Sequence, residues 1–160
     1  MAGPTGCVVV GVDGGAGGVR ALRLGARLAR ESGLPLIGVL AWTPTAAARS
    51  AFGGERLRAC ERTAMARLDR TCHQVLDEVA SCDAKLIPFV ARGRAGRVLL
   101  DVADAADDVL VLGSHRPEGR TARYCLAHAR CSVVTVPRIP ERAADRAAQQ
   151  IAVKGAPAER

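Results

Sequence analysis

The sequence predicts an α/β fold in which helices cover both faces of a five-stranded, parallel, doubly wound sheet. Short runs of Val, Leu and Ile alternate with longer segments whose apolar residues recur every three or four positions. The short runs are continuously apolar, which is typical of strands buried on both faces of a parallel sheet. Right-handed crossovers between such strands favour a doubly wound arrangement. Only 2% of the residues are aromatic, so the core must be aliphatic.

The order of these segments gives five strands and four helices. We expect the strands at residues 7–12, 36–41, 85–90, 109–112 and 132–136. We expect the helices at residues 18–31, 55–80, 95–107 and 119–129. Gly33 follows the first helix, where glycine suits the left-handed backbone that ends many helices. Pro88 has no amide hydrogen to donate to a sheet, so the third strand should lie at an edge.

The spacing within two of these helices predicts which side chains are buried. On the long helix at 55–80, Cys60 and Cys72 share the apolar stripe and should lie in the core. On the helix at 95–107, Asp101, Asp104 and Asp108 form an acidic row that should face solvent. The inward residues of that helix are expected to be Leu99, Val102 and Ala106.

The length of 160 residues suits one domain, which we place at residues 1–137. Residues 138–160 are rich in Arg, Ala and Glu with little periodicity, and we expect a mobile C-terminal tail. The apolar run at 7–12 is too short for a signal sequence or a membrane span and has no basic segment before it. We therefore expect a cytoplasmic protein with reduced cysteines and no membrane partner.

The net charge of +7 does not by itself indicate a nucleic-acid partner. The arginines are spread along the expected helices and mixed with acidic residues, a pattern typical of solvated helix faces. The sequence contains no basic block and no aromatic-plus-basic motif for stacking bases, so we expect no nucleic-acid binding.

Two loops should lie at the carboxyl ends of neighbouring strands, where ligands bind in such sheets. One is the glycine-rich segment 13–18 after the first strand, and the other is the segment 113–116 after the fourth. Glycines let backbone amides approach phosphate, and a helix N-terminus adds partial positive charge. A tight strand-to-helix turn would explain the glycines of 13–18 equally well. The sequence there fits neither a dinucleotide fingerprint nor a Walker loop.

Several motifs in order resemble the universal stress protein family across residues 7–137. The first strand ends in Val-Asp-Gly, and Gly93-Arg94-Ala95 is similar to the turn after the family's third strand. The segment 106–114, Ala-Asp-Asp-Val-Leu-Val-Leu-Gly-Ser, looks like the family's hallmark fourth strand. The segment 127–134, Ala-His-Ala-Arg-Cys-Ser-Val-Val, resembles the family's closing strand. The resemblance implies the strand order 3-2-1-4-5.

The resemblance also implies an adenine nucleotide site, for ATP or AMP. The positions that match the family's site are Val12, Asp13, Gly14, Val39, Gly113, Ser114, His115, Gly119, Arg120 and Thr121. Asp13 and Val39 match the adenine and ribose side. On the phosphate side Gly113 matches the family's first glycine, but Arg116 replaces its second and Arg120 replaces a Ser or Thr.

The spacer between the two glycine clusters is also much shorter here than in nucleotide-binding members of the family. A loop that wraps a triphosphate needs both length and glycines, because several amides must converge on its oxygens. The sequence therefore predicts a non-catalytic stress-response or regulatory protein that binds adenine nucleotide weakly or not at all. The alternative is an ATP-binding member with slow hydrolysis. An unidentified regulatory protein is the expected partner.

Other kinds of site receive less support from the residues. The spacing of Cys125, His128 and Cys131 could suggest zinc, but a fourth ligand is not evident, so we expect no metal. The chain has no Gly-x-Ser-x-Gly elbow. It also lacks the strand-end aspartate and lysine of a phospho-acceptor receiver domain. We therefore expect no catalytic residues.

We expect two copies of the chain to form a homodimer through the fifth strand. In the order 3-2-1-4-5 it lies at a sheet edge, and it is short, β-branched and uncharged. Such an edge exposes unpaired amides and carbonyls unless charge, proline or a partner protects it. The edge residues that should pair with a second copy are Val133, Val134, Thr135 and Val136.

Overall fold

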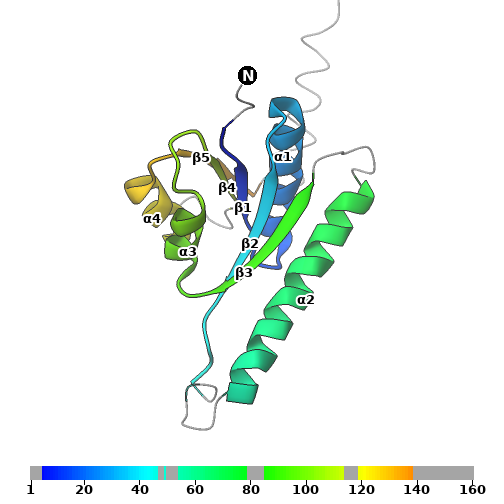
Figure 1. The fold of residues 1–160 in the computed structure, drawn as a ribbon, viewed down its shortest axis with the longest axis vertical. Helices are drawn as coiled ribbons and strands as arrows, with labels where there is room; N and C mark the ends of the chain where they lie inside the picture. The colour runs from blue at the N-terminus through cyan, green and yellow to red at the C-terminus, as the bar shows by residue number, and fades with distance from the viewer. Residues whose placement is uncertain (1–4, 47–48, 50–53, 79–84, 114–118, 139–160) are drawn as a thin grey trace, which may run out of the picture.

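The computed structural model describes residues 5–46, 49, 54–78, 85–113 and 119–138 (Figure 1). Five strands form one sheet in the order β3-β2-β1-β4-β5, and every neighbouring pair is parallel. The strands are β1 (Val8–Gly11), β2 (Leu36–Trp42), β3 (Leu86–Arg92), β4 (Val109–Gly113) and β5 (Ser132–Val136). The predicted fold class and strand order are confirmed, and β3 with its proline lies at an edge as expected.

Four helices connect these strands and cover both faces of the sheet (Figure 1). They are α1 (Ala16–Ser32), α2 (Gly54–Glu78), α3 (Ala95–Val102) and α4 (Arg120–His128). Helices α1 and α2 pack together on one face, and α3 and α4 pack together on the other. Because the strands are parallel, their carboxyl ends and the N-termini of α1, α3 and α4 share one end of the molecule.

The core consists of two aliphatic clusters, one on each face of the sheet. Alternate residues of the central strand β1 enter different clusters: Val8 and Val10 join the cluster under α1 and α2, and Val9 joins the one under α3 and α4. All three valines are at most 1% exposed. This two-sided burial explains why the strands are continuously apolar in sequence.

Helix α1 ends where glycine was expected to end it. Gly33 has a φ of 67°, in the left-handed region, and its amide donates to the carbonyls of Ala29 and Arg30. The next amide, that of Leu34, donates to the carbonyl of Ala29 at 3.0 Å. These bonds satisfy carbonyls that would otherwise lack partners at the helix end.

The expectation that one helix spans 95–107 with a solvated acidic row is wrong in its second half. Helix α3 ends at Val102, Ala106 is exposed, and Asp108 is only 4% exposed. One oxygen of the Asp108 carboxylate accepts from the Cys7 amide at 2.9 Å, and the other accepts from the Ala105 amide at 3.0 Å. The carboxylate thus joins the turn after α3 to the start of β1.

The cysteines of α2 differ in burial. Cys72 is 5% exposed and lies in the cluster under α1 and α2, as expected. Cys60 is only half-buried and lines a surface cavity instead of the core. Cys60 lies about one helical turn before Ala64, which is the first buried side chain of α2.

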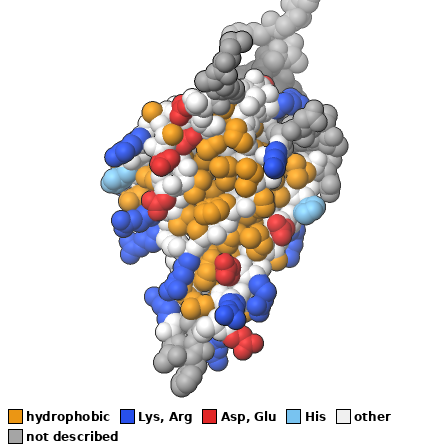
Figure 2. Space-filling view, in the orientation of Figure 1, with side chains coloured by type: hydrophobic (Ala, Val, Ile, Leu, Met, Phe, Trp, Pro, Cys, Tyr) orange, Lys and Arg blue, Asp and Glu red, His pale blue; other side chains and the backbone are white. Residues whose placement is uncertain are grey.

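The edge strand β3 carries exposed apolar side chains. Ile87 and Phe89 are 41% and 42% exposed, and they alternate along β3 with Leu86 and Val90, which pack on the side of α1 and α2. Figure 2 shows hydrophobic side chains gathered in the middle of this view, over the region of β2 and β3. The exposed apolar side chains of β3 therefore form part of the hydrophobic surface seen on this face.

The expected tail at 138–160 lies outside the described residues, apart from Arg138. The expected helix end beyond residue 78 also lies outside them. Among the described residues, no helix is both long enough and apolar enough to cross a membrane.

Candidate functional site

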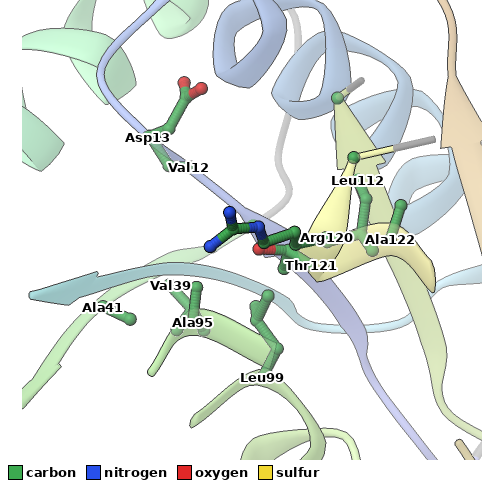
Figure 3. A pocket seen from close by; sticks show the side chains of 13 residues that line it. Val12, Asp13, Val39, Ala41, Ala95, Leu99, Leu112, Arg120, Thr121 and Ala122 are labelled. Carbon is green, nitrogen blue, oxygen red and sulfur yellow. The ribbon is translucent and has the colours of Figure 1, made fainter. Parts of the chain in front are cut away.

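A cavity of about 340 Å³ lies at the carboxyl ends of β1, β2 and β4, between the N-termini of α3 and α4 (Figure 3). It occupies the end of the sheet where the two suspected loops were expected to meet. The described residues that line it are Gly11, Val12, Asp13, Val39, Ala41, Ala95, Leu99, Leu112, Gly113, Gly119, Arg120, Thr121 and Ala122.

The walls of this cavity are mostly aliphatic. Val12, Val39, Leu99 and Leu112 are between 1% and 5% exposed and belong to the close-packed core. They come from four different elements or their ends, so the core fixes their positions. Such walls suit a flat apolar group, while the few polar groups at the mouth would set its orientation.

Asp13 is the one carboxylate among the described residues of the lining. Its Oδ1 accepts from the amide of Gly15 at 2.8 Å, just before α1 begins. Its backbone carbonyl accepts from Nη2 of Arg67 on α2 at 3.1 Å. These bonds hold Asp13 where β1 turns into α1, and its side chain is exposed at the mouth of the cavity.

The opposite side of the mouth is formed by the start of α4. Arg120 and Thr121 are the first two residues of that helix, and Arg120 is exposed. Figure 3 shows the Arg120 guanidinium directed from α4 toward the side of the cavity that Val39 and Ala95 form. The mouth therefore combines one anionic and one cationic side chain around an apolar interior.

Gly113 lies at the end of β4 in close contact with the first turn of α1. A side chain at this position would collide with the carbonyl of Gly17. The contact lets α1 cross directly over the end of β4. The glycine is therefore explained by packing, whether or not a phosphate ever approaches it.

The cavity brings together seven of the ten residues that the family resemblance singled out. They are Val12, Asp13, Val39, Gly113, Gly119, Arg120 and Thr121. Gly14 is not among the lining residues and lies beside the Arg67 side chain. Ser114 and His115 lie outside the described residues.

Sequence analysis missed six lining residues: Gly11, Ala41, Ala95, Leu99, Leu112 and Ala122. A signal existed for Ala41, because it follows Val39 by two positions on the same strand and must share its face. For Leu99 and Ala122 no signal existed, since a small or apolar residue on a helix looks the same in a core and in a pocket wall.

The residues of the possible zinc motif do not form a cluster. Cys125 is fully buried, and burial raises the pKa of its thiol to about 11. His128 is exposed, and its Nδ1 lies 2.9 Å from the carbonyl of Tyr124. In the part of the chain that the structure describes, no three His, Cys, Asp or Glu side chains are placed to hold a metal ion.

Known proteins resemble this chain in fold and in sequence pattern. The family model described as the universal stress protein family matches residues 6–137. The solved structure of universal stress protein UspA from Lactobacillus plantarum has a TM-score of 0.64 at 23% identity, and the match covers 85% of this chain and 99% of that one. No curated protein matches this chain significantly.

Two further solved structures share the fold. A universal stress protein family member from Burkholderia pseudomallei has a TM-score of 0.61 at 17% identity, covering 86% of this chain and 100% of that one. A universal stress protein in complex with cAMP has a TM-score of 0.54 at 22% identity, covering 82% and 96%. Because the family model spans most of the 160 residues, this chain belongs to the universal stress protein family.

Proposed function

We propose that this chain is a non-catalytic, cytoplasmic regulatory module of the stress response that holds an adenine nucleotide weakly in the cavity described above. One observation carries the proposal: an apolar cavity with polar residues at its mouth stands beside a very short connection from β4 to α4. Only residues 114–119 join these two elements. The cavity thus fits a base, while the connection lacks the length to wrap a triphosphate.

The proposal that the cavity holds a base is based on the walls and the volume of the cavity. The volume of about 340 Å³ is near the lower end of the range for small-molecule pockets, about 300 to 1,000 Å³. Val39 and Ala41 on β2 lie on one side, and Leu112 and Ala122 lie on the other. The cAMP complex of a protein with this fold supports a nucleotide as the ligand class.

The phosphate side is where this chain differs from a strong nucleotide binder. A triphosphate needs several backbone amides that converge on its oxygens. The carbonyl of Gly17 fills the space beside the Cα of Gly113, so a phosphate cannot approach Gly113 from that direction. We therefore expect a Kd for Mg-ATP of about 1 mM or weaker, which is about −4 kcal/mol.

We assign no reaction to this site because of the residues that line it. Among the described ones, Asp13 is the single carboxylate and Thr121 the single hydroxyl, and Oδ1 of Asp13 already accepts a bond from Gly15. Nucleophilic catalysis needs a nucleophile within hydrogen-bond reach of a base. The alternative, an ATP-binding member with slow hydrolysis, predicts release of phosphate from Mg-ATP by the purified protein.

The site is tested by titrating ¹⁵N-labelled protein with AMP. Amide shifts should move at Val12, Asp13, Val39 and Ala41 and at the start of α4, and they should fit a weak Kd. The Ala41→Phe variant, which fills the cavity, should abolish these changes, whereas Ala66→Phe on the exposed face of α2 should keep them. Changes confined to another surface would contradict the assignment.

We also propose that the chain forms a homodimer through β5 and acts on an unidentified regulatory protein. Strand β5 pairs with β4 on one side only, and Val133, Val134 and Val136 are half-buried against the helices. Thr135 is exposed. A second copy pairing across a twofold axis would satisfy the outer edge of β5 in both chains.

A further inference from the structure

A second hollow adjoins the cavity and opens between α3 and α4. The described residues that line it are Arg94, Ala95, Gly96, Arg97, Arg120, Thr121 and Tyr124, and its volume is about 540 Å³. We call it the arginine groove. It shares Ala95, Arg120 and Thr121 with the apolar cavity, so the two form one continuous depression.

Three guanidinium groups line the arginine groove, and no carboxylate stands among its described lining residues. Arg94 and Arg97 come from the start of α3, and Arg120 comes from the start of α4. All three residues are exposed, so each side chain can turn toward a ligand. Guanidinium is the cation that best matches phosphate, because its planar fork donates two parallel hydrogen bonds.

The N-termini of two helices face the same groove. Neither α3 nor α4 has a side-chain cap on its first amides, and neither carries an acidic residue in its first turn. The free amides and the positive ends of both helix dipoles therefore add to the charge of the three arginines. These two features together favour an anion in the groove.

Helices α3 and α4 pack closely beside the groove. Gly96 packs against the ring of Tyr124, and a side chain at position 96 would come within 2.6 Å of that ring. The ring of Tyr124 in turn stacks on His128, with 4.4 Å between ring centroids. The contact of Gly96 with Tyr124 brings α3 and α4 close together, so Arg97 and Arg120 approach the groove from different helices.

We propose that the arginine groove is a phosphate-binding site, so that a nucleoside phosphate lies with its base in the apolar cavity and its phosphate between α3 and α4. The ligand then passes from the cavity to the groove over Ala95 and Thr121, and its phosphate does not lie in the connection from β4 to α4. The base half of this ligand rests on the function proposed above, but the groove binds phosphate on its own.

The experiment uses ¹⁵N-labelled full-length protein and three probes: inorganic pyrophosphate, adenosine and AMP. Pyrophosphate should shift the amides of Ala95, Gly96 and Thr121, and AMP should bind about 5- to 10-fold more tightly than adenosine. The Arg97→Gln variant should weaken pyrophosphate and AMP about 5- to 10-fold and leave adenosine unchanged, because Arg97 lines the groove but not the cavity.

Arg123→Gln is the matched control, since it removes the same charge from an exposed position of α4 outside the groove. Equal losses of affinity in both variants would show general charge attraction and would overturn the proposal of a phosphate site in the groove. No binding of pyrophosphate, or AMP no tighter than adenosine, would overturn it as well. Pyrophosphate binding that depends on Arg97 while adenosine does not bind would uphold the groove and reject the proposed base site.

Discussion

Gly113 stands where the family's phosphate-binding motif begins, yet its contacts here lie with the first helix. The carbonyl of Gly17 occupies the space that a side chain at position 113 would need. A residue that matches a ligand motif can thus be required by packing alone. At this scale, the family resemblance matches the residue to a motif but does not establish what the residue does there.

A Gly113→Ala substitution tests this interpretation without any ligand. The added methyl group must push α1 away from β4, so we expect a loss of about 1 to 3 kcal/mol in the free energy of unfolding. Urea denaturation measures it. Gly54→Ala at the start of α2 is the control, because the added carbon would meet no packed neighbour within 4 Å beyond the adjoining backbone of its own helix. A fully stable Gly113→Ala protein would contradict the packing explanation.

Asp108 has a structural role that its position in the apparent helical pattern of the sequence does not indicate. Its carboxylate accepts from the amides of Cys7 and Ala105 while almost fully buried. Asp108→Ala leaves both amides without this partner, and we expect a loss of about 2 to 3 kcal/mol in urea denaturation. The exposed Asp104→Ala should cost less than about 0.5 kcal/mol. Similar effects of the two changes would refute this role.

At the scale of elements, continuous apolar runs and three-to-four spacing were enough to predict each strand and helix among the described residues. What they could not locate was the end of α3. A helical pattern continues through Asp108 in the sequence, and only the folded chain brings that carboxylate beside Cys7. Lining residues such as Leu99 were not predicted for a similar reason, because an apolar residue shows the same sequence pattern in a core and in a pocket wall.

Strand β5 gives the element-scale test of the proposed dimer. Val134 packs toward α1, so a charge there would disturb the core, whereas Thr135 is exposed. Thr135→Lys should place a charge on the pairing edge and convert the dimer to monomer with little loss of stability. Size-exclusion chromatography with light scattering reports the mass. An unmodified protein that is monomeric at micromolar concentration would rule out this dimer.

At the scale of the whole molecule, buried thiols couple stability to alkaline pH. Burial is the first cause that raises the pKa of Cys7 to about 12 and those of Cys72 and Cys125 to about 11, from an ordinary value of 9.0. For Cys7 the neighbouring Asp108 adds to the effect. Above pH 9 the unfolded chain releases these protons and the folded chain keeps them, so unfolding becomes more favourable as pH rises.

We therefore expect full stability from these groups below pH 9 and a progressive loss between pH 9 and pH 11. The two buried thiols, Cys72 and Cys125, each contribute at most about 1.4 kcal/mol per pH unit in that window, and the half-buried Cys7 contributes less. Urea denaturation at pH 8 and pH 10.5 measures the loss, and the slope should be smaller in Cys125→Ala than in the unmodified protein. Equal slopes in the two proteins would contradict the assignment to buried thiols.

The whole-molecule account depends on a cavity that fits a base and a connection too short to wrap a triphosphate. Isothermal titration with Mg-ATP tests this claim most directly. We predict a Kd of about 1 mM or weaker, because residues 114–119 are too few to wrap three phosphates and the exposed arginines of the groove add only a weak, solvent-screened attraction. Micromolar binding of Mg-ATP would contradict the account and favour the ATP-binding alternative.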